Sequence, residues 1–444
     1  MIVHRVWGAS LTSRMNIVLP LLALGLACRL ASAAPAPAGH DGSPVPVLDA
    51  FGQRLAGIRG QIPAVTAAAE AAADRVLAEP RTSLVVTTFP GAVEFANELL
   101  SRAGGLAKAL SAFQASQTGV DKTIMLASVR SWEQDGAVVL PKLAEYRRRG
   151  YHVTVFGSRA GCPEPAAWDA LVDNGAGDGG AASGTVNIIA NVTLGWMWCC
   201  EYVSALSRKG KYPGILKSIA LQGARENNAL YQNAEGRVWM GETTNAVPAG
   251  RLADLYLQRM DRLMADLRSP HVQGSVSNAA AIIAASLREG RTVQLSGTGH
   301  LVNYEMMRDD LRTPFKACRS EKLGEGLVNG DLVVWIGYMG NAGLIKTGGV
   351  DRLSGLLASG IRMISCEAPM PAAGNTDPGF LAQVLPERLA PLPVPSPVIA
   401  IVDQSWSMPD AEVPVPWAPG WMAPVSGINA LLLLRILDEQ VAGR

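Results

Sequence analysis

The sequence has almost no net charge and few of the residues that build metal or disulfide frameworks. Its 444 residues carry 39 Lys and Arg against 38 Asp and Glu, a formal net charge of +1, without a long basic run. This balance gives no sign of a nucleic-acid or membrane-surface partner. The six cysteines show no CxxC spacing, which argues against a disulfide scaffold or a zinc site. We therefore expect no metal, and no motif suggests a nucleotide cofactor.

Long apolar runs are also scarce, and the first lies in a targeting segment. Arg14 precedes an apolar run over 17–27, and Ala31-Ser-Ala33 has the form of a signal-peptidase site. The run is short for a membrane span. We expect a signal peptide over 1–33, cleavage near Ala33 and export to the periplasm or the exterior. An uncleaved N-terminal anchor is the alternative, and translation could start at Met15.

Beyond a Pro/Ala-rich tail at 34–47, strand-length apolar runs alternate with helical stretches. Predicted strands cover 83–88, 123–128, 153–157, 170–172, 293–295, 332–336, 362–365 and 398–402. Predicted helices cover 48–58, 64–77, 93–103, 138–149, 185–207, 251–267, 279–287, 304–311, 350–359 and 427–439. A polar loop is expected at 218–228. The alternation predicts an α/β fold with parallel sheets flanked by helices.

Several landmarks occur twice, half a chain apart. Arg81-Thr82 corresponds to Arg291-Thr292, and Gly150 to Gly360, at the same spacing of 210 residues. A shared spacing of this kind is typical of an internal repeat. We expect two tandem domains, over 48–240 and 276–444, joined by a connecting helix in 241–275.

The most informative short motif is Ser296-Gly-Thr-Gly-His300, which follows a predicted strand and precedes a predicted helix. Backbone N–H groups and small hydroxyls in such a turn favour an anion. Ser296, Gly297, Thr298 and Gly299 are the predicted cradle. The alternative is a glycine-rich turn that binds nothing.

Together these features resemble the sugar isomerase (SIS) domain family, in its phosphosugar-isomerase-like branch, as two diverged tandem copies. Gly297-Thr-Gly-His300 matches the family's Gly-Thr-Gly-His-Ser turn, and Glu98 with Arg102-Ala-Gly-Gly105 matches the helix that follows it. Asp173-Asn-Gly resembles the family's Asp-Asn-Gly segment. The first copy has lost the glycines of its turn, and the loop 330–341 keeps glycines but has lost the family's serines.

The resemblance implies a three-layer flavodoxin-like or Rossmann-type domain in each copy, pairing into an intramolecular pseudo-dimer. It implies a sugar, sugar phosphate or amino-sugar derivative bound at the carboxyl ends of the strands. Besides the cradle, the implied binding residues are Asn341 in the second copy and, in the first, Thr87, Thr88, Ser128, Arg130, Ser131 and Arg225. Arg130 could pair with a phosphate in place of a serine loop.

Aldose–ketose isomerisation requires a base that moves a proton between adjacent carbons. His300 with Glu305 or Glu98 could supply this catalysis if a pocket brings them together. Alternatively, His300 is a hydrogen-bonded turn residue and Glu98 a surface carboxylate. The corresponding alternative function is a binding protein that has lost the isomerase chemistry.

Two apolar segments have structural and functional interpretations. Cys199-Cys200, in a long apolar helix, is expected to be buried as two small hydrophobes. The segment 415–421, with Trp417 and Trp421 among prolines, could stack on a sugar ring. Packing of these rings around the prolines is the alternative.

Overall fold

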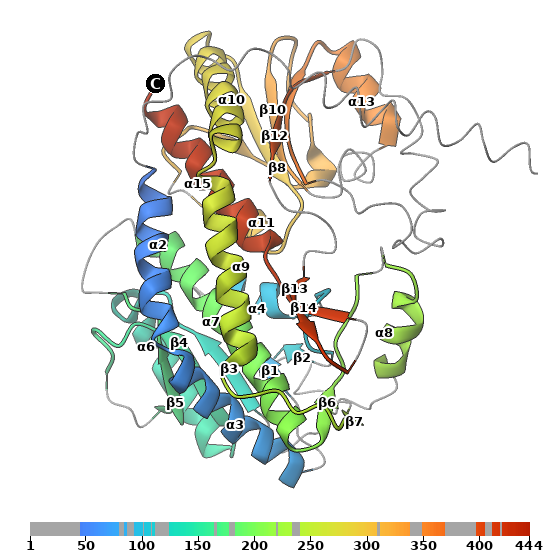
Figure 1. The fold of residues 1–444 in the computed structure, drawn as a ribbon. Helices are drawn as coiled ribbons and strands as arrows, with labels where there is room; N and C mark the ends of the chain where they lie inside the picture. The colour runs from blue at the N-terminus through green and yellow to red at the C-terminus, as the bar shows by residue number, and fades with distance from the viewer. Residues whose placement is uncertain are drawn as a thin grey trace, which may run out of the picture. The chain divides into compact units, whose positions relative to one another are not determined.

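The computed structural model describes most of the chain after residue 44 (Figure 1). The described residues are 45–79, 84–86, 93–100, 102–107, 109–111, 124–163, 167–176, 183–218, 221–232, 240–308, 311–337, 349–368, 397–404, 411–417 and 420–444. The expected signal peptide, most of the tail, and the candidate residues Thr87, Thr88 and Asn341 lie outside them.

The first half of the described chain contains a five-stranded parallel sheet. Its strand order is β2-β1-β3-β4-β5. The strands are β1 (Leu84–Val86), β2 (Ala109–Ser111), β3 (Ile124–Ser128), β4 (His152–Gly157) and β5 (Ala170–Asp173). β3 is buried along its whole length, as expected for a central strand covered on both faces.

The second half contains a sheet with the same order, β9-β8-β10-β11-β12, also parallel. Its strands are β8 (Val293–Gly297), β9 (Lys316–Ala317), β10 (Leu332–Ile336), β11 (Arg362–Glu367) and β12 (Val398–Asp403). In each sheet the second strand along the chain lies outside the first. This is the 2-1-3-4-5 order of flavodoxin-like folds. The predicted α/β fold class is confirmed.

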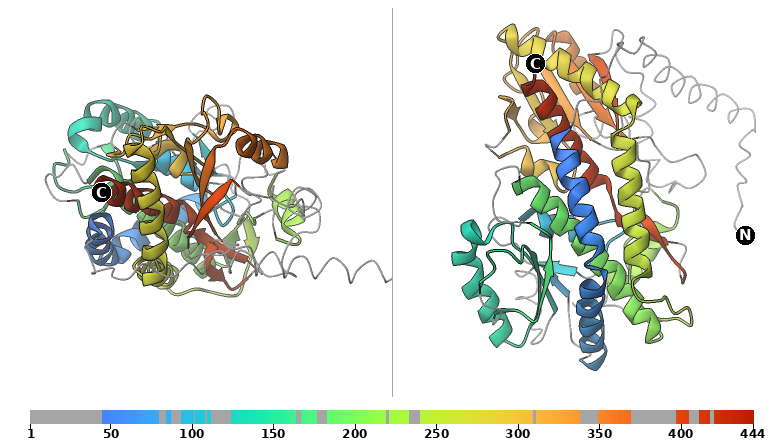
Figure 2. Two further views of the ribbon diagram at one scale, coloured as in Figure 1. Left: turned by 90° about the horizontal axis from the view of Figure 1, so that it is seen from above. Right: turned by 60° about the vertical axis from the view of Figure 1, so that its left-hand side comes forward.

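Helices cover both faces of each sheet (Figures 1 and 2). They are α2 (Pro46–Arg59), α3 (Ile62–Ala78), α4 (Val93–Leu99), α6 (Trp132–Arg148), α7 (Ser183–Arg208), α8 (Ala224–Gln232), α9 (Arg251–Leu267), α10 (Pro270–Arg288), α11 (Val302–Glu305), α13 (Gly349–Ala358) and α15 (Ser426–Ala442). A 3-10 turn, η3 (Ser320–Lys322), and two antiparallel pairs complete the described elements. The pairs are β6 (Lys211–Pro213) with β7 (Met240–Glu242), and β13 (Ala411–Val415) with β14 (Gly420–Pro424).

One hydrophobic core joins the two sheets. It contains inner-face residues of both, such as Leu126 and Val334, together with α2, α3, α7, α9, α10 and α15. Separate clusters lie under α6 on the outer face of the first sheet and under α13 on the outer face of the second. The inner helices α2, α7, α9 and α15 lie beside one another (Figures 1 and 2). The halves therefore fold against each other.

Helix α7 is the centre of this core. Every residue from Thr185 to Ser207 is buried, and burial of a ring such as Trp196 or Trp198 contributes about 1.5–3 kcal/mol. Cys199 and Cys200 are buried among them as free thiols, which confirms their expected role. Burial raises the pKa of both thiols above the usual range. No helix in the described part of the chain is long and apolar enough to cross a membrane.

Two sequence-based elements were wrong, and two predicted helices began too late: α6 begins at Trp132 rather than at residue 138, and α10 begins before residue 279. The expected loop 218–228 contains the start of α8. Asn227 and Asn228 favour turns locally, but within α8 their side chains bond to the backbone of Ile215 and Lys217. α10 begins at Pro270, capped by the Ser269 hydroxyl, well before the predicted start at 279.

The helix predicted over 304–311 is confined to α11, which ends at Glu305. The Asp438 carboxylate accepts from the backbone N–H groups of Arg312 and Thr313, at 3.0 and 2.7 Å. Pro314 follows, and the residue before a proline disfavours helical geometry. A contact with α15, distant in sequence, therefore helps to end the helical path.

Candidate functional site

Each sheet has a switch point where the strand order reverses, and ligands of open α/β sheets bind at its carboxyl edge. In the first sheet this point lies between β1 and β3, and in the second between β8 and β10. Ser128 ends β3 and is followed closely by Arg130. The turn 297–300 follows β8. The candidate residues thus lie at the two edges where a ligand is expected.

The turn after β8 is held tightly to β10. The backbone N–H of Thr298 donates to the carbonyl oxygen of Ile336 at 2.9 Å. A Cβ on Gly297 would lie 2.3 Å from that same oxygen, so only glycine fits there. Thr298, Gly299 and His300 are half-buried.

Ser296 occupies a different environment from the rest of the predicted cradle. It alternates with Leu295, which faces the shared core, so its hydroxyl faces the outer side of the sheet. There it is the register partner of Trp335 on β10. It also lies against Cys318, whose pKa burial raises and the hydrogen bond with Ser296 partly lowers. Its side chain therefore supports the sheet rather than the turn.

His300 contacts the other half of the chain. Its Nδ1 lies 2.9 Å from the carbonyl oxygen of Asn97 on α4. Because a carbonyl only accepts, Nδ1 carries the hydrogen in this contact. In the neutral ring, Nε2 then has the lone pair. This fixes the tautomer in which Nε2 can accept a proton.

Arg130, in the loop between β3 and α6, contacts the same helix α4. Its Nη2 donates to Oε1 of Glu94 and to Oε1 of Glu305, both at 3.1 Å. Glu94 and Asn97 are three residues apart on α4. A guanidinium from the first half and an imidazole from the second half therefore contact the same short helix.

Glu305 binds several cations and is fully buried. Its Oε2 accepts from Nη2 of Arg435 at 3.2 Å and from the hydroxyl of Thr185 at 3.3 Å, and Nε of Arg308 lies 3.9 Å from Oε1. With Arg130 and Glu94, the cluster has three arginines and two glutamates.

Nε of Arg130 and Oε2 of Glu94 are buried atoms of this cluster that have no hydrogen-bond partner among the described residues. Buried polar atoms are nearly always satisfied. An unsatisfied donor and acceptor at a strand edge are what a polar ligand or an ordered water would complete.

Glu98, the third predicted catalytic residue, is also fully buried, so it is not a surface carboxylate. Its Oε2 accepts from Nη1 of Arg102 at 2.7 Å, and Nη2 of that arginine donates to the hydroxyl of Ser426. A Cβ on Gly427 would lie 2.4 Å from the Glu98 carboxylate. Burial raises the pKa of Tyr256 well above its usual value, and the charge of Glu98 raises it further.

Glu98 and Glu305 have matching surroundings. Glu98, on α4 of the first half, lies at the start of α15 of the second half, beside Ser426 and Gly427. Glu305, on α11 of the second half, lies at the start of α7 of the first half, beside Thr185. The positive end of a helix dipole stabilises a carboxylate. Each glutamate thus ties one half of the chain to the long helix of the other.

A set of buried amides positions the edge of the first sheet, and only Asn174 among them belongs to a motif noted in the sequence. Asn191 on α7 donates from Nδ2 to the Ser128 hydroxyl at 2.9 Å and accepts from Nδ2 of Asn174 at 2.8 Å. One turn earlier, Asn187 donates to the carbonyl oxygen of Arg130 at 3.1 Å. Two asparagines spaced i, i+4 in an otherwise apolar helix were the signal available in the sequence.

Two further predicted residues lie elsewhere. Ser131 is the N-cap of α6, where its hydroxyl accepts from the backbone N–H of Gln134 at 3.4 Å. Arg225 is exposed on α8. Within the described residues, no group of three or more His, Cys, Asp and Glu side chains could hold a metal ion.

No protein-family model matches the chain, and a search of curated proteins finds no match. Among solved structures it is similar to a protein of Salmonella typhimurium LT2 provisionally described as sugar-binding, with a TM-score of 0.42, 11% identity, and coverage of 89% of this chain and 98% of that one. A provisional phosphosugar isomerase of Silicibacter pomeroyi DSS-3 gives a TM-score of 0.41, 10% identity and coverage of 89% and 97%.

A tagatose-6-phosphate ketose/aldose isomerase of Escherichia coli gives a TM-score of 0.42, 10% identity, and coverage of 91% of this chain and 93% of that one. These descriptions agree with the phosphosugar-isomerase-like SIS resemblance of the motifs. Likenesses at this TM-score carry no inference about the ligand or the reaction.

Proposed function

We propose that this protein binds a sugar phosphate or a related anionic amino-sugar derivative where the switch-point edges of its two sheets meet on α4. The observation that carries this proposal is that Arg130 and His300, from the two halves, both contact α4, through Glu94 and the Asn97 carbonyl. A guanidinium recognises phosphate or carboxylate oxygens. An imidazole and a threonine hydroxyl, from His300 and Thr298, can bond the sugar hydroxyls.

The arginines of the cluster support an anionic ligand. The side chains of Arg130 and Arg435 are largely buried, where an anion is attracted more strongly than in water. Nε of Arg130, buried and without a described partner, offers a donor.

The same contacts favour binding over catalysis. Glu305 and Glu98, two of the three predicted catalytic groups, are each bonded to arginines. A carboxylate in such a pair is stabilised in its charged form and is a weak base. We assign both as positioning residues, which hold α7 and α15 at the site.

Sugar isomerisation is the second candidate, and the geometry of His300 is the observation that favours it. Its bond to the Asn97 carbonyl selects the tautomer in which Nε2 can take a proton from a sugar carbon. In this candidate His300 is the base.

We also propose that the two halves arose by duplication and pair as an intramolecular pseudo-dimer. The matching strand orders and the reciprocal positions of Glu98 and Glu305 support this. Small-angle scattering that shows two detached lobes would contradict it. Export with cleavage near Ala33 remains a proposal, which N-terminal sequencing of the protein from its host would test.

Isothermal titration calorimetry with glucosamine 6-phosphate and with glucosamine, which lacks only the phosphate, tests the binding proposal. We expect the phosphorylated sugar to bind at least about tenfold more tightly. Thr298→Val and His300→Asn should each weaken this binding, whereas Arg225→Ala, on exposed α8, should leave it unchanged. Equal affinities for the two sugars, or binding unaffected by either turn variant, would refute the proposal.

Exchange of the proton at C2 of the bound sugar phosphate with solvent deuterium separates the two candidates. Binding without exchange identifies a binding protein. Exchange that is lost in His300→Asn, while binding is only weakened, identifies an isomerase. The asparagine keeps a donor for the Asn97 carbonyl, so the turn should remain in place.

A further inference from the structure

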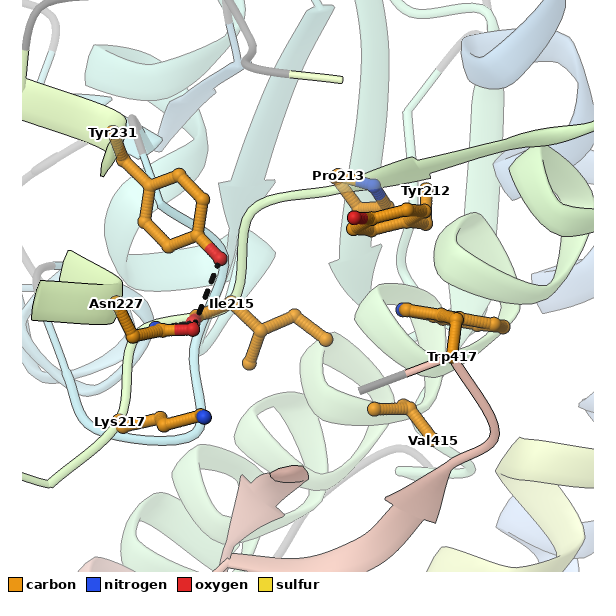
Figure 3. Close-up of a pocket in the computed structure, with 8 residues that line it drawn as sticks. All are labelled: Tyr212, Pro213, Ile215, Lys217, Asn227, Tyr231, Val415 and Trp417. Atoms are coloured by element: carbon orange, nitrogen blue, oxygen red, sulfur yellow. Dashed lines mark hydrogen bonds between the residues drawn. The ribbon is translucent and has the colours of Figure 1, made fainter. Parts of the chain in front are cut away.

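A pocket at the hairpin β13–β14 shares no residue with the strand-edge site (Figure 3). It is a shallow depression, open to solvent, and is lined by residues of both halves. Tyr212 and Trp417 lie on one side and Tyr231 on the other, with Ile215 between them (Figure 3).

Two glycines fix the tyrosine rings. Tyr212 on β6 is the register partner of Gly241 on β7, where a Cβ would lie 2.4 Å from the ring. A Cβ on Gly214 would lie 2.6 Å from the ring of Tyr231. Each tyrosine ring therefore packs directly against the backbone of a glycine. The rings of Tyr212 and Trp417 stack with centroids 5.9 Å apart and an interplanar angle of 24°.

Polar groups lie at the same opening. The hydroxyl of Tyr231 donates to Oδ1 of Asn227 at 3.4 Å, and Nδ2 of Asn227 donates to the carbonyl of Ile215 at 3.1 Å. Asn228 accepts from the backbone N–H of Lys217 and donates to its carbonyl oxygen, both at 2.9 Å. Lys217 is thus held at the rim, and none of the eight described lining residues is acidic.

The pocket exists because of an insertion in one half only. Residues 174–182 separate β5 from α7, whereas residues 404–425 separate β12 from α15 and contain the hairpin. The hairpin reaches across to the first half. Ala423 donates its backbone N–H to Gly104, and Asn245 donates from Nδ2 to the Pro416 carbonyl at 3.2 Å. These contacts place Trp417 beside Tyr212.

We propose that this pocket is a second binding site, which takes one saccharide ring bearing a negatively charged substituent. The C–H faces of a pyranose are apolar and pack against aromatic rings. The Tyr231 hydroxyl and the Asn227 amide form hydrogen bonds with sugar hydroxyls, and Lys217 pairs with the anionic group. The depression is open to solvent, so one ring can lie against its aromatic side chains without being enclosed.

Methyl β-glucuronide and methyl β-glucoside, titrated into the full chain by calorimetry, form the test. They differ only in the carboxylate, and neither can open its ring. We expect the glucuronide to bind more tightly. Trp417→Ala should weaken both ligands by about tenfold, and Lys217→Gln should weaken only the glucuronide. Trp421→Ala is the matched control, because Trp421 lies on the same hairpin, is 44% exposed and does not line the pocket.

Absence of binding up to millimolar ligand, or affinities unchanged by Trp417→Ala and Lys217→Gln, would overturn the proposal. Binding lost in Thr298→Val but not in Trp417→Ala would place the saccharide at the strand-edge site instead. If circular dichroism shows that Trp417→Ala unfolds, Tyr231→Phe takes its place. That variant removes only the hydroxyl, and the proposal then requires weaker binding of both glycosides.

Discussion

The two halves share a strand order but keep different groups at their switch points. The first half has Arg130 after β3, held by glutamates from both halves, while the second has the turn 297–300 after β8, with a half-buried threonine and histidine. Neither edge has both a cation and a glycine turn among its described residues. The guanidinium and the glycine turn thus belong to different halves, and both contact α4.

The buried glutamates show the same asymmetry in their partners. Glu305 lies within 4 Å of nitrogens on Arg130, Arg435 and Arg308, whereas Glu98 pairs with Arg102. The reciprocal arrangement explains why both halves depend on each other's long helix. The difference in partner number predicts which half is more sensitive to the loss of its carboxylate.

The largest effect is expected from Glu305→Ala. Removal of this carboxylate leaves Arg130 and Arg435 buried with one counter-ion fewer, which should cost about 3–5 kcal/mol of stability. Glu98→Ala should cost less, because Arg102 keeps its bond to Ser426. Urea unfolding followed by circular dichroism measures both. A larger loss for Glu98→Ala would show that partner number does not set the cost.

The next largest loss of stability is expected from Gly297→Ala. The added Cβ must displace Ile336 on β10, so we expect a loss of about 1–3 kcal/mol in thermal or urea unfolding. The matched control is Gly274→Ala in the interior of α10, where no atom lies within 4 Å of an added Cβ. There the gain in helix propensity should stabilise by about 0.5–1 kcal/mol. Equal effects at the two glycines would argue against a close approach of β8 and β10.

The fold class was predictable from the sequence, whereas the site was predictable only in its residue types. Hydrophobic periodicity located most buried strands and the helices α2, α7 and α9, because burial imposes those patterns locally. The side chain of Ser296 faces away from the turn because side chains alternate along β8. Which face it takes depends on the pairing of β8 with β10, which the sequence does not reveal. The partners of Glu305 come from residues 130, 185, 308 and 435, and no local pattern encodes contacts between segments so far apart.

Ser131→Ala tests whether Ser131, a predicted ligand residue, acts as the N-cap of α6. Loss of the bond from the Gln134 backbone should destabilise by about 1 kcal/mol. Binding of the anionic sugar should be unchanged once the variant is folded. Thermal unfolding and calorimetry separate the two roles. Weaker sugar binding with unaltered stability would restore Ser131 to the site.

The smallest expected effect is on the pH dependence of stability. It compares the first residues of β4 and β11, which are His152 and Arg362. His152 begins β4, and Arg362 begins β11 at the repeat spacing. Burial lowers the pKa of His152 below its usual value, and the charge of Asp169 offsets part of this. As pH falls, the unfolded chain therefore takes up the proton first. Stability from this group is complete above the unfolded value, about pH 6.5, and is lost below it.

We expect His152→Gln to unfold with a weaker dependence on pH than the wild type between about pH 7.5 and 5.5, a window that brackets the ordinary histidine pKa. At the equivalent position of β11, Arg362 donates to Ser286 and to the carbonyl of Gly330, so no histidine begins that strand. His271→Gln, at an exposed position on α10, is the control. Urea midpoints at several pH values give the comparison. If the His152 and His271 variants lose the same pH dependence, burial of His152 is not its source.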